Sequence, residues 1–148
     1  MSAFKLIAEI TALSVSKIWD QAKLEWVLEE VYESDEPETC LCGHFPIKEL
    51  CVLGNQRNHA SATVGNCCVK KFIGLPSDKI FTAVKRIRKD PTKSLNAEAI
   101  DHASKRGWLT QWEKEFYFDI MRKRNLTQRQ ADKKKQINEL VLARMQRK

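Results

Sequence analysis

Nearly all the metal-binding side chains of this 148-residue chain lie in one short segment. All five cysteines and two of the three histidines fall between Cys40 and Phe72. Cysteine sulfur and histidine nitrogen are the ligands that zinc prefers, but cysteines also serve as reactive thiols or as small apolar core residues. Three interpretations of the segment are therefore open: a metal site, a reactive thiol, or simple packing.

The order of these residues favours a metal site. Cys40, Cys42 and His44 alternate just before an expected hairpin, and Cys67–Cys68 follow where its second strand should turn into a helix. This order is the layout of a treble-clef zinc finger, whose four ligands form a closed, structural site. Neighbouring helical residues point about 100° apart, so only one of the last two cysteines should reach the ion. The predicted zinc ligands are Cys40, Cys42, His44 and Cys68.

The other members of the segment have simpler interpretations. Cys67 is a packing residue or an alternative ligand, Cys51 reads as a small apolar residue of a strand, and His59 as a solvated turn residue. Gly43 suits a backbone that wraps round an ion, because glycine adopts unusual conformations at little cost. The N-terminal end of the expected helix would help to stabilise a thiolate at Cys68.

Three sequence strings carry a resemblance to a known kind of protein. They are C-L-C-G-H at 40–44, V-L-G-N at 52–55 and V-G-N-C-C-V-K-K-F at 64–72. Together they resemble a family of small phage and bacterial proteins with a compact zinc-finger-like unit, over about residues 26–76. W-E-K-E-F-Y and L-T-Q-R-Q also look like helical tails appended to such units in proteins linked to DNA. The resemblance implies a mobile-element origin and a nucleic-acid context.

The acidic N-terminal part combines helix and strand signals. A first helix is expected from Ser14 or Ser16, either of which can cap it, through Ala22. Residues 25–34 could continue this helix or form a strand, and a strand is favoured. Residues 34–39, which include a proline, read as a loop.

A hairpin and a short helix follow. Residues 47–53 and 60–64 are expected as antiparallel strands joined by a turn. Residues 67–75 then read as a short helix that is stopped by Gly74 and Pro76.

The remainder is predicted to be helical from its capping residues. Ser77 can open a helix that Asp90 and Pro91 close. Three more starts are given by Asn96 and by two capping boxes, Thr110 with Glu113 and Thr127 with Gln130. The predicted fold is α+β: a zinc-binding, treble-clef-like hairpin and helix (1–76, with an N-terminal helix), then a helical, basic region (77–148) packed on it.

Charge is unevenly distributed along the chain. Residues 1–39 contain nine acidic side chains and three lysines, a net charge of −6, whereas residues 40–148 contain 23 basic and ten acidic side chains, a net charge of +13. The basic part therefore either meets a polyanion or is partly neutralised within the fold. The predicted nucleic-acid contacts are Lys70, Lys71, Arg122, Lys123, Arg124, Lys133, Lys134 and Lys135.

Two apolar patterns offer an alternative to nucleic-acid binding. Ile137, Leu140, Val141 and Met145 form a helical stripe, so the nearby lysines can simply be its solvated opposite face. Trp108, Trp112 and Phe116 could stack on bases, but their spacing of four favours a core stripe.

A catalytic role is less favoured. An HNH-type nuclease would need a further histidine or asparagine on the helix after the hairpin, and residues 67–75 contain neither. Cys67 with His44 or His59 could form a reactive thiol pair, but a zinc site would use the same groups. Phosphate-loop, metalloprotease and deaminase motifs are absent from the sequence. We therefore predict a protein that is not an enzyme and has no small-molecule substrate.

The expected location is the cytoplasm, without a membrane partner. Lys5 and Glu9 interrupt the apolar N-terminus before a signal-peptide core forms, and no run approaches the roughly 18 apolar residues that span a bilayer. Reducing conditions then favour metal ligands over disulfides. The predicted function is a phage-type zinc protein that binds nucleic acid, DNA more than RNA. The alternative is a modulator of a host protein that uses the helical or acidic surface.

Overall fold

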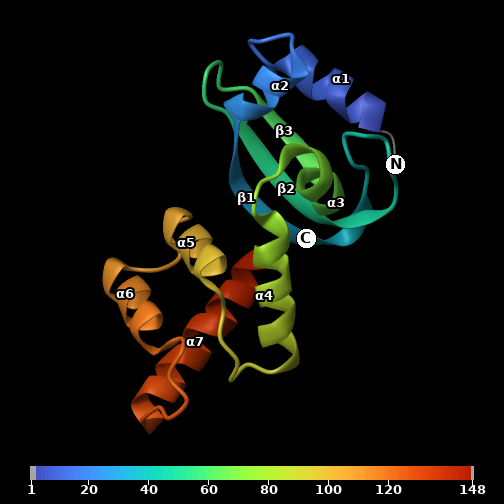
Figure 1. Cartoon of the computed structure of the whole chain (residues 1–148). Coiled ribbons are helices and arrows are strands. Elements are labelled where there is room, and N and C mark those ends of the chain that lie inside the picture. The colour runs from blue at the N-terminus through green and yellow to red at the C-terminus, as the bar shows by residue number, and fades with distance from the viewer. Residues whose placement is uncertain (1–2, 148) are drawn as a thin grey trace. The chain divides into compact units, whose positions relative to one another are not determined.

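The chain divides after Asp78. A computed structural model describes residues 3–147 (Figure 1), and within them residues up to Asp78, with Arg147, form a first unit. Residues Lys79–Gln146 form a second unit. The described part of the chain is α+β, with a small antiparallel sheet of three main strands and seven α-helices.

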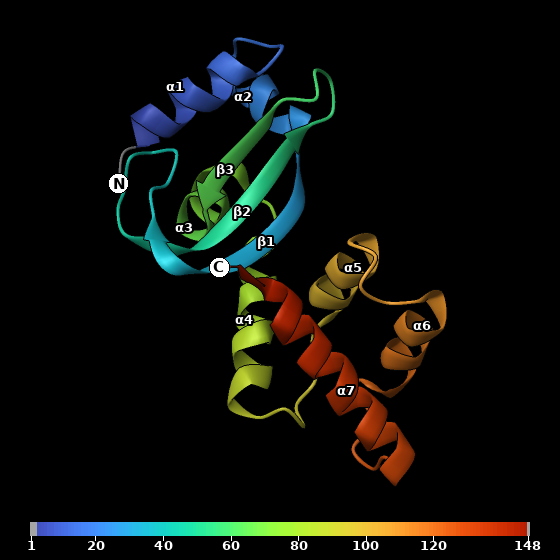
Figure 2. The same cartoon turned by 180° about the vertical axis from the view of Figure 1, so that it is seen from behind.

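The first unit is built round the sheet. Figure 2 shows the long strands side by side, in the order β3-β2-β1. The two-residue β4 follows β1 in the order of the sheet. Cys51 at the middle of β2 lies opposite Val31 of β1 and Val64 of β3, and all three are buried. The elements of this unit are α1 (Ala3–Leu13), α2 (Trp19–Ala22), a 3₁₀ turn (Lys23–Glu25), β1 (Trp26–Glu38), β2 (Ile47–Asn55), β3 (Ser61–Gly65), α3 (Asn66–Cys68), a π-helical turn (Val69–Ile73) and β4 (Gln146–Arg147, whose first residue belongs to the second unit).

The expected first helix is wrong. Helix α1 ends at Leu13, and the single turn α2 with the 3₁₀ turn at Lys23–Glu25 follows before β1. The backbone N–H groups of Val15 and Ser16 each donate to the buried carboxylate of Glu25 at 2.8 Å. The Ser14 hydroxyl accepts from the Trp26 indole at 2.9 Å instead of capping a helix. These bonds hold residues 14–16 as a connection rather than a helical turn.

The predicted strands are largely confirmed. Strand β1 begins at Trp26, and β2 pairs with β3 as an antiparallel hairpin. The loop expected at residues 34–39 is wrong, because β1 continues to Glu38 with an irregularity in its pairing after Glu33. The short helical segment after β3 ends at Gly74, as expected, with a positive φ of 81°.

The second unit consists of helices whose starts were readable from the sequence. Asn96 accepts from the Ala99 N–H at 3.0 Å, and both capping boxes form, at Thr110 and at Thr127. The helices are α4 (Ser77–Lys89, whose first two residues belong to the first unit), α5 (Ala97–Lys105), α6 (Gln111–Ile120) and α7 (Gln128–Met145). These helix predictions are confirmed, and side-chain caps define the starts of α5, α6 and α7.

A buried polar network organises the second unit. The Tyr117 hydroxyl donates to Asn138 Oδ1 at 2.7 Å and accepts from the Leu95 N–H at 2.9 Å. Asn138 Nδ2 in turn donates to the carbonyls of Pro91 and Lys93, both at 2.8 Å. Burial raises the pKa of Tyr117 to about 12, so the hydroxyl stays protonated. The network ties the α4–α5 loop to α6 and α7.

The two apolar patterns of this unit have different outcomes. Ile137, Val141 and Met145 are buried, so the stripe on α7 belongs to the core. The expected aromatic core stripe is wrong for Trp112, whose exposed fraction is 61%. Helix α6 buries Tyr117 and Ile120 instead, which lie on another face. Trp112 stacks on the half-buried Phe116, with ring centres 5.3 Å apart.

Candidate metal centre

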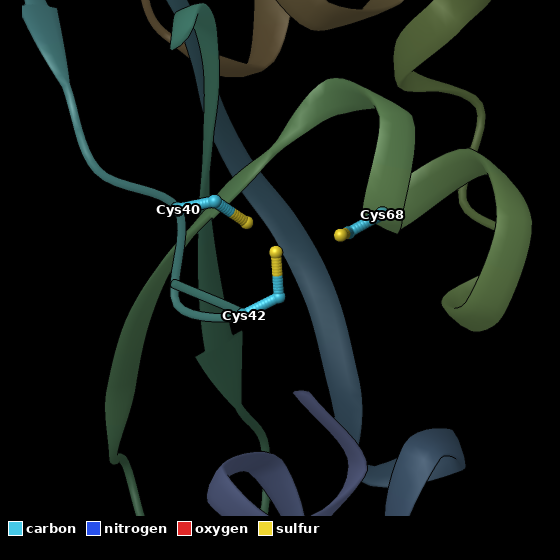
Figure 3. A group of neighbouring side chains, drawn as sticks. All are labelled: Cys40, Cys42 and Cys68. Carbon is cyan, nitrogen blue, oxygen red and sulfur yellow. The ribbon is translucent and has the colours of Figure 1, made fainter. Parts of the chain in front are cut away.

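Three cysteines converge in the first unit. The sulfur atoms of Cys40, Cys42 and Cys68 all lie within 4.8 Å of one another, and all three side chains are buried. Figure 3 shows the three sulfurs pointing toward one shared point, two from the loop after β1 and one from the helical segment after β3. Among the described residues this is the group of metal-type side chains that comes together.

The loop after β1 forms a tight knuckle round this point. The Gly43 N–H donates to the Cys40 carbonyl at 2.8 Å, and the Cys40 N–H donates to the His44 carbonyl at 2.9 Å. Gly43 has a φ of 92°, which side chains other than glycine rarely adopt. The turn therefore directs both of its cysteines to the same side.

Gly65, at the end of β3, completes the setting of Cys40. Its N–H donates to Cys40 Sγ at 3.2 Å, a bond that stabilises negative charge on sulfur. A Cβ at Gly65 would lie 3.4 Å from that sulfur and 3.1 Å from Ile47 Cδ1. A larger residue here would therefore require Ile47 to shift by a few tenths of an ångström. The sequence pattern did not predict a role for Gly65 at the site. A glycine directly before a ligand-bearing helix could have indicated one.

The three sulfurs fit one tetrahedral ion. Zinc binds cysteine sulfur at about 2.3 Å, so two sulfurs on the same ion lie about 3.8 Å apart. The observed upper limit of 4.8 Å is close to this spacing. Burial, followed by the neighbouring Cys42 and Cys40 groups, raises the pKa of Cys68. A divalent cation at this point would supply counter-charge for thiolates.

His44 lies outside the sulfur cluster. Its side chain is exposed, and it lines a cavity of about 280 Å³ that also borders the three cysteines. The exposed Cys67 and the half-buried Glu49 line the same cavity. The structure thus brings three of the four predicted ligands together, and the assignment of the fourth to His44 stays a prediction.

Two other potential metal ligands of the first unit are Cys51 and His59. Cys51 is fully buried in β2, and burial raises the pKa of its thiol to about 12. His59 is exposed in the hairpin turn. Neither belongs to the sulfur cluster.

The predicted nucleic-acid contacts differ in exposure. Lys70 and Lys71 are exposed in the first unit, and Lys70 pairs with Asp78 at 3.4 Å. In the second unit the exposed members are Arg122, Lys123, Arg124 and Lys135.

Two lysines of α7 are engaged within the second unit. Lys133 is half-buried and pairs with Glu113 at 3.0 Å. Lys134 is buried, and this burial lowers its pKa, with the charge of Lys93 adding to the decrease and Asp90 opposing it. Of the three consecutive lysines of α7, Lys135 is therefore the exposed one.

Comparison with known proteins gives no assignment. No protein-family model matches the chain, and neither a curated protein nor a solved structure is significantly similar to it. Within residues 3–147, no helix combines the length and the apolar character needed to cross a membrane.

Proposed function

We propose that this protein is a non-enzymatic zinc-binding protein that binds nucleic acid. Cys40, Cys42 and Cys68 would hold the ion in a treble-clef-like unit, and the exposed basic residues of the helices would contact phosphates. The observation that carries the proposal is the convergence of three buried sulfurs from two distant segments. The resemblance to small phage and bacterial zinc-finger-like proteins points the same way.

The ion's role in this proposal is structural. When bound, Zn²⁺ supplies a strong cross-link between segments that the unfolded chain keeps apart. The chain's own groups prepare the site: the knuckle aligns Cys40 and Cys42, and the Gly65 N–H supports Cys40. His44 would provide the fourth ligand from the cavity rim, which closes the site in the way that is typical of structural zinc.

The nucleic-acid part rests on charge and exposure. Residues 40–148 carry a net charge of +13, and several of the basic side chains in the second unit are exposed on or beside its helices. Contacts of this kind bind phosphates with little sequence preference and weaken steeply as salt rises. DNA is the first probe, because the resembling helical tails belong to proteins linked to DNA.

Metal content tests the zinc part. The chain purified under reducing conditions should contain about one zinc per chain, as expected of a single closed site. Cys68→Ser should lose most of it, whereas Cys67→Ser, a matched change at the neighbouring exposed cysteine, should retain it. Equal zinc content in both variants would contradict the assignment of Cys68.

Salt-dependent binding tests the nucleic-acid part. Labelled DNA of random sequence should bind at low salt, and the logarithm of the affinity should fall linearly with the logarithm of salt concentration. DNA and RNA of matched length would establish the preference. No binding to either at low salt would overturn this part while leaving the zinc part intact.

A second candidate function is protein binding, as a modulator of another protein. The most exposed large apolar side chains near the N-terminus of the first unit are Phe4, Leu24 and Ile18, which are 85%, 75% and 60% exposed. Contiguous apolar exposure is a feature of protein-interaction sites. A partner retained by the wild-type chain and lost by a Phe4→Ser, Leu24→Ser variant would favour this candidate. Retention by both chains would exclude this apolar surface as the interface.

A further inference from the structure

A second cavity lies entirely within the second unit. Its volume is about 610 Å³, within the range of roughly 300–1,000 Å³ that is common for small-ligand sites. The walls come from three segments: Arg86 of α4, residues 94–98 at the start of α5, and Phe118, Met121 and Arg122 at the end of α6 (Figure 1). Residues far apart in sequence thus face one space.

The cavity walls favour an anion. Arg86 and Arg122 both line it, and both are exposed. The acidic residue among the lining groups is Glu98, whose charge is already paired with Lys79 at 3.5 Å. Guanidinium groups bind phosphate well because their planar N–H donors match its oxygens.

An apolar surface lies beside one of these arginines. Phe118, Met121 and Arg122 are spaced by three and four residues, so they lie along one side of the end of α6. The Phe118 side chain is 36% exposed. Aromatic side chains bind bases by stacking, whatever the base, because every base has a flat π-face.

The walls are tied together by hydrogen bonds. The Ser94 hydroxyl donates to the Met121 carbonyl at 2.9 Å, and Arg86 Nη1 donates to the Ser94 carbonyl at 3.4 Å. Asn96 Nδ2 donates to the Lys79 carbonyl at 2.9 Å. A site held in this way loses little freedom when a ligand binds.

We infer that this cavity binds one nucleotide of a single-stranded nucleic acid. Its phosphate would contact Arg86 and Arg122, and its base would lie against Phe118. Lys123 and Arg124 follow directly and are exposed, so they are available for the next phosphates of a strand. The inference rests on the proposed nucleic-acid function and assigns it a place and a strand type.

Binding of three labelled probes to the full chain tests the inference. The probes are a short oligothymidine, an abasic strand of the same length, and a duplex. Oligothymidine should bind tightest, because only its bases are both present and unpaired. Phe118→Ala should weaken oligothymidine binding about fivefold, the lower end for loss of one stacked base. It should leave the abasic strand unaffected.

The arginines are tested by a charge-matched pair of variants. Arg86→Gln, Arg122→Gln should weaken oligothymidine binding and lower the slope of log affinity against log salt by about 0.7, for one phosphate of a single strand that is no longer neutralised. Arg129→Gln, Arg144→Gln removes the same charge from exposed positions of α7 outside the cavity. This control should change both quantities less. Arg122→Gln alone, at an exposed side chain, provides a milder version with half the change in slope.

The outcomes separate the inference from the function on which it rests. No binding of the wild-type chain to any probe would overturn the proposed nucleic-acid function and the inference with it. Wild-type binding that the cavity and control pairs reduce equally would overturn the inference alone. Thymidine monophosphate that competes as well as oligothymidine, at equal concentration, would overturn the assignment to a strand.

Discussion

Each of the two units of this protein is stabilised internally in a different way. In the first unit, the cysteine centre joins the knuckle after β1 to the helix after β3, and Glu25 fixes residues 15 and 16 from a distance. In the second unit, α5, α6 and α7 each begin at their own cap, and one buried network round Tyr117 joins the segments. The first unit thus contains a cluster that a bound ion would complete, whereas the second unit relies on helix caps and on hydrogen bonds between its own segments.

This difference teaches where each unit is vulnerable. A small sheet depends strongly on any link that joins distant segments, because such a link reduces the freedom of the unfolded chain. Helices with good caps need fewer such links. We therefore expect the loss of the metal centre to affect the first unit selectively.

The largest expected effect comes from Cys68→Ser. It removes one sulfur ligand, and with metal bound to the wild-type chain we expect the free energy of unfolding of the first unit to fall by more than about 4 kcal/mol, as for other lost metal sites. Denaturant unfolding followed at Trp26 in the first unit would measure it. Cys67→Ser is the control. Its free energy of unfolding should fall by less than about 1 kcal/mol, as for exposed positions.

Tyr117→Phe should produce the corresponding effect in the second unit. It removes the hydroxyl that donates to Asn138 and accepts from the Leu95 N–H, so two buried polar groups lose a partner. We expect a loss of about 2 kcal/mol in the free energy of unfolding. Hydrogen exchange should place the loss in α6, α7 and the loop at 90–95. A loss confined to the first unit would contradict the division between the units.

Gly65→Ala tests, within the first unit, how far Gly65 supports Cys40. The added Cβ would approach Ile47 Cδ1 to 3.1 Å and Cys40 Sγ to 3.4 Å. The neighbours must shift slightly, so we expect a loss of about 1 kcal/mol, at the low end for overpacking. Zinc affinity, measured by competition with a chelator, should fall as well. Unchanged affinity would show that the Gly65 N–H and its close approach do not support Cys40.

The smallest expected effect is the pH dependence due to Glu25. Burial alone would raise its pKa, but bonds from Asn55, Ser16 and Val15 and the charge of Arg57 outweigh it, so the pKa lies below the usual 4.5. The contribution of the Glu25 carboxylate to the stability of the fold is therefore present in full above pH 4.5, and it is lost as the pH falls through the lowered pKa.

Comparison of the wild-type chain with Glu25→Gln separates the contribution of Glu25 to stability from the loss of bound metal at low pH. The wild-type chain should be more stable than the variant at neutral pH, and the difference between them should shrink as the pH falls below 4.5. A stability difference that grows on acidification would contradict the account.

Features set by near neighbours in the sequence were predictable. The caps at Asn96, Thr110 and Thr127 bond to residues three positions away, so their pattern is visible in the sequence. The β2–β3 hairpin follows from alternation and turn residues. The three converging cysteines were also predictable, since their order relative to the hairpin determines which ends meet.

Features set by distant residues were not predictable. Residues 14–16 look like a helix start, but the carboxylate that overrides this lies nine or ten residues later, at Glu25. Trp112 looks like a core residue, but the packing of α6 buries the face that bears Tyr117. The arginine cavity is a third case, because Arg86 and Arg122 line one cavity only in the folded chain.

Hydrogen exchange of the full chain with and without a strong zinc chelator tests the central claim most directly. With zinc bound, the amides of β2, β3 and residues 66–73 should be protected. Chelation should remove this protection and leave α6 and α7 unchanged, and added zinc should restore it. Protection in the first unit that is the same with and without the chelator would contradict a metal centre at Cys40, Cys42 and Cys68.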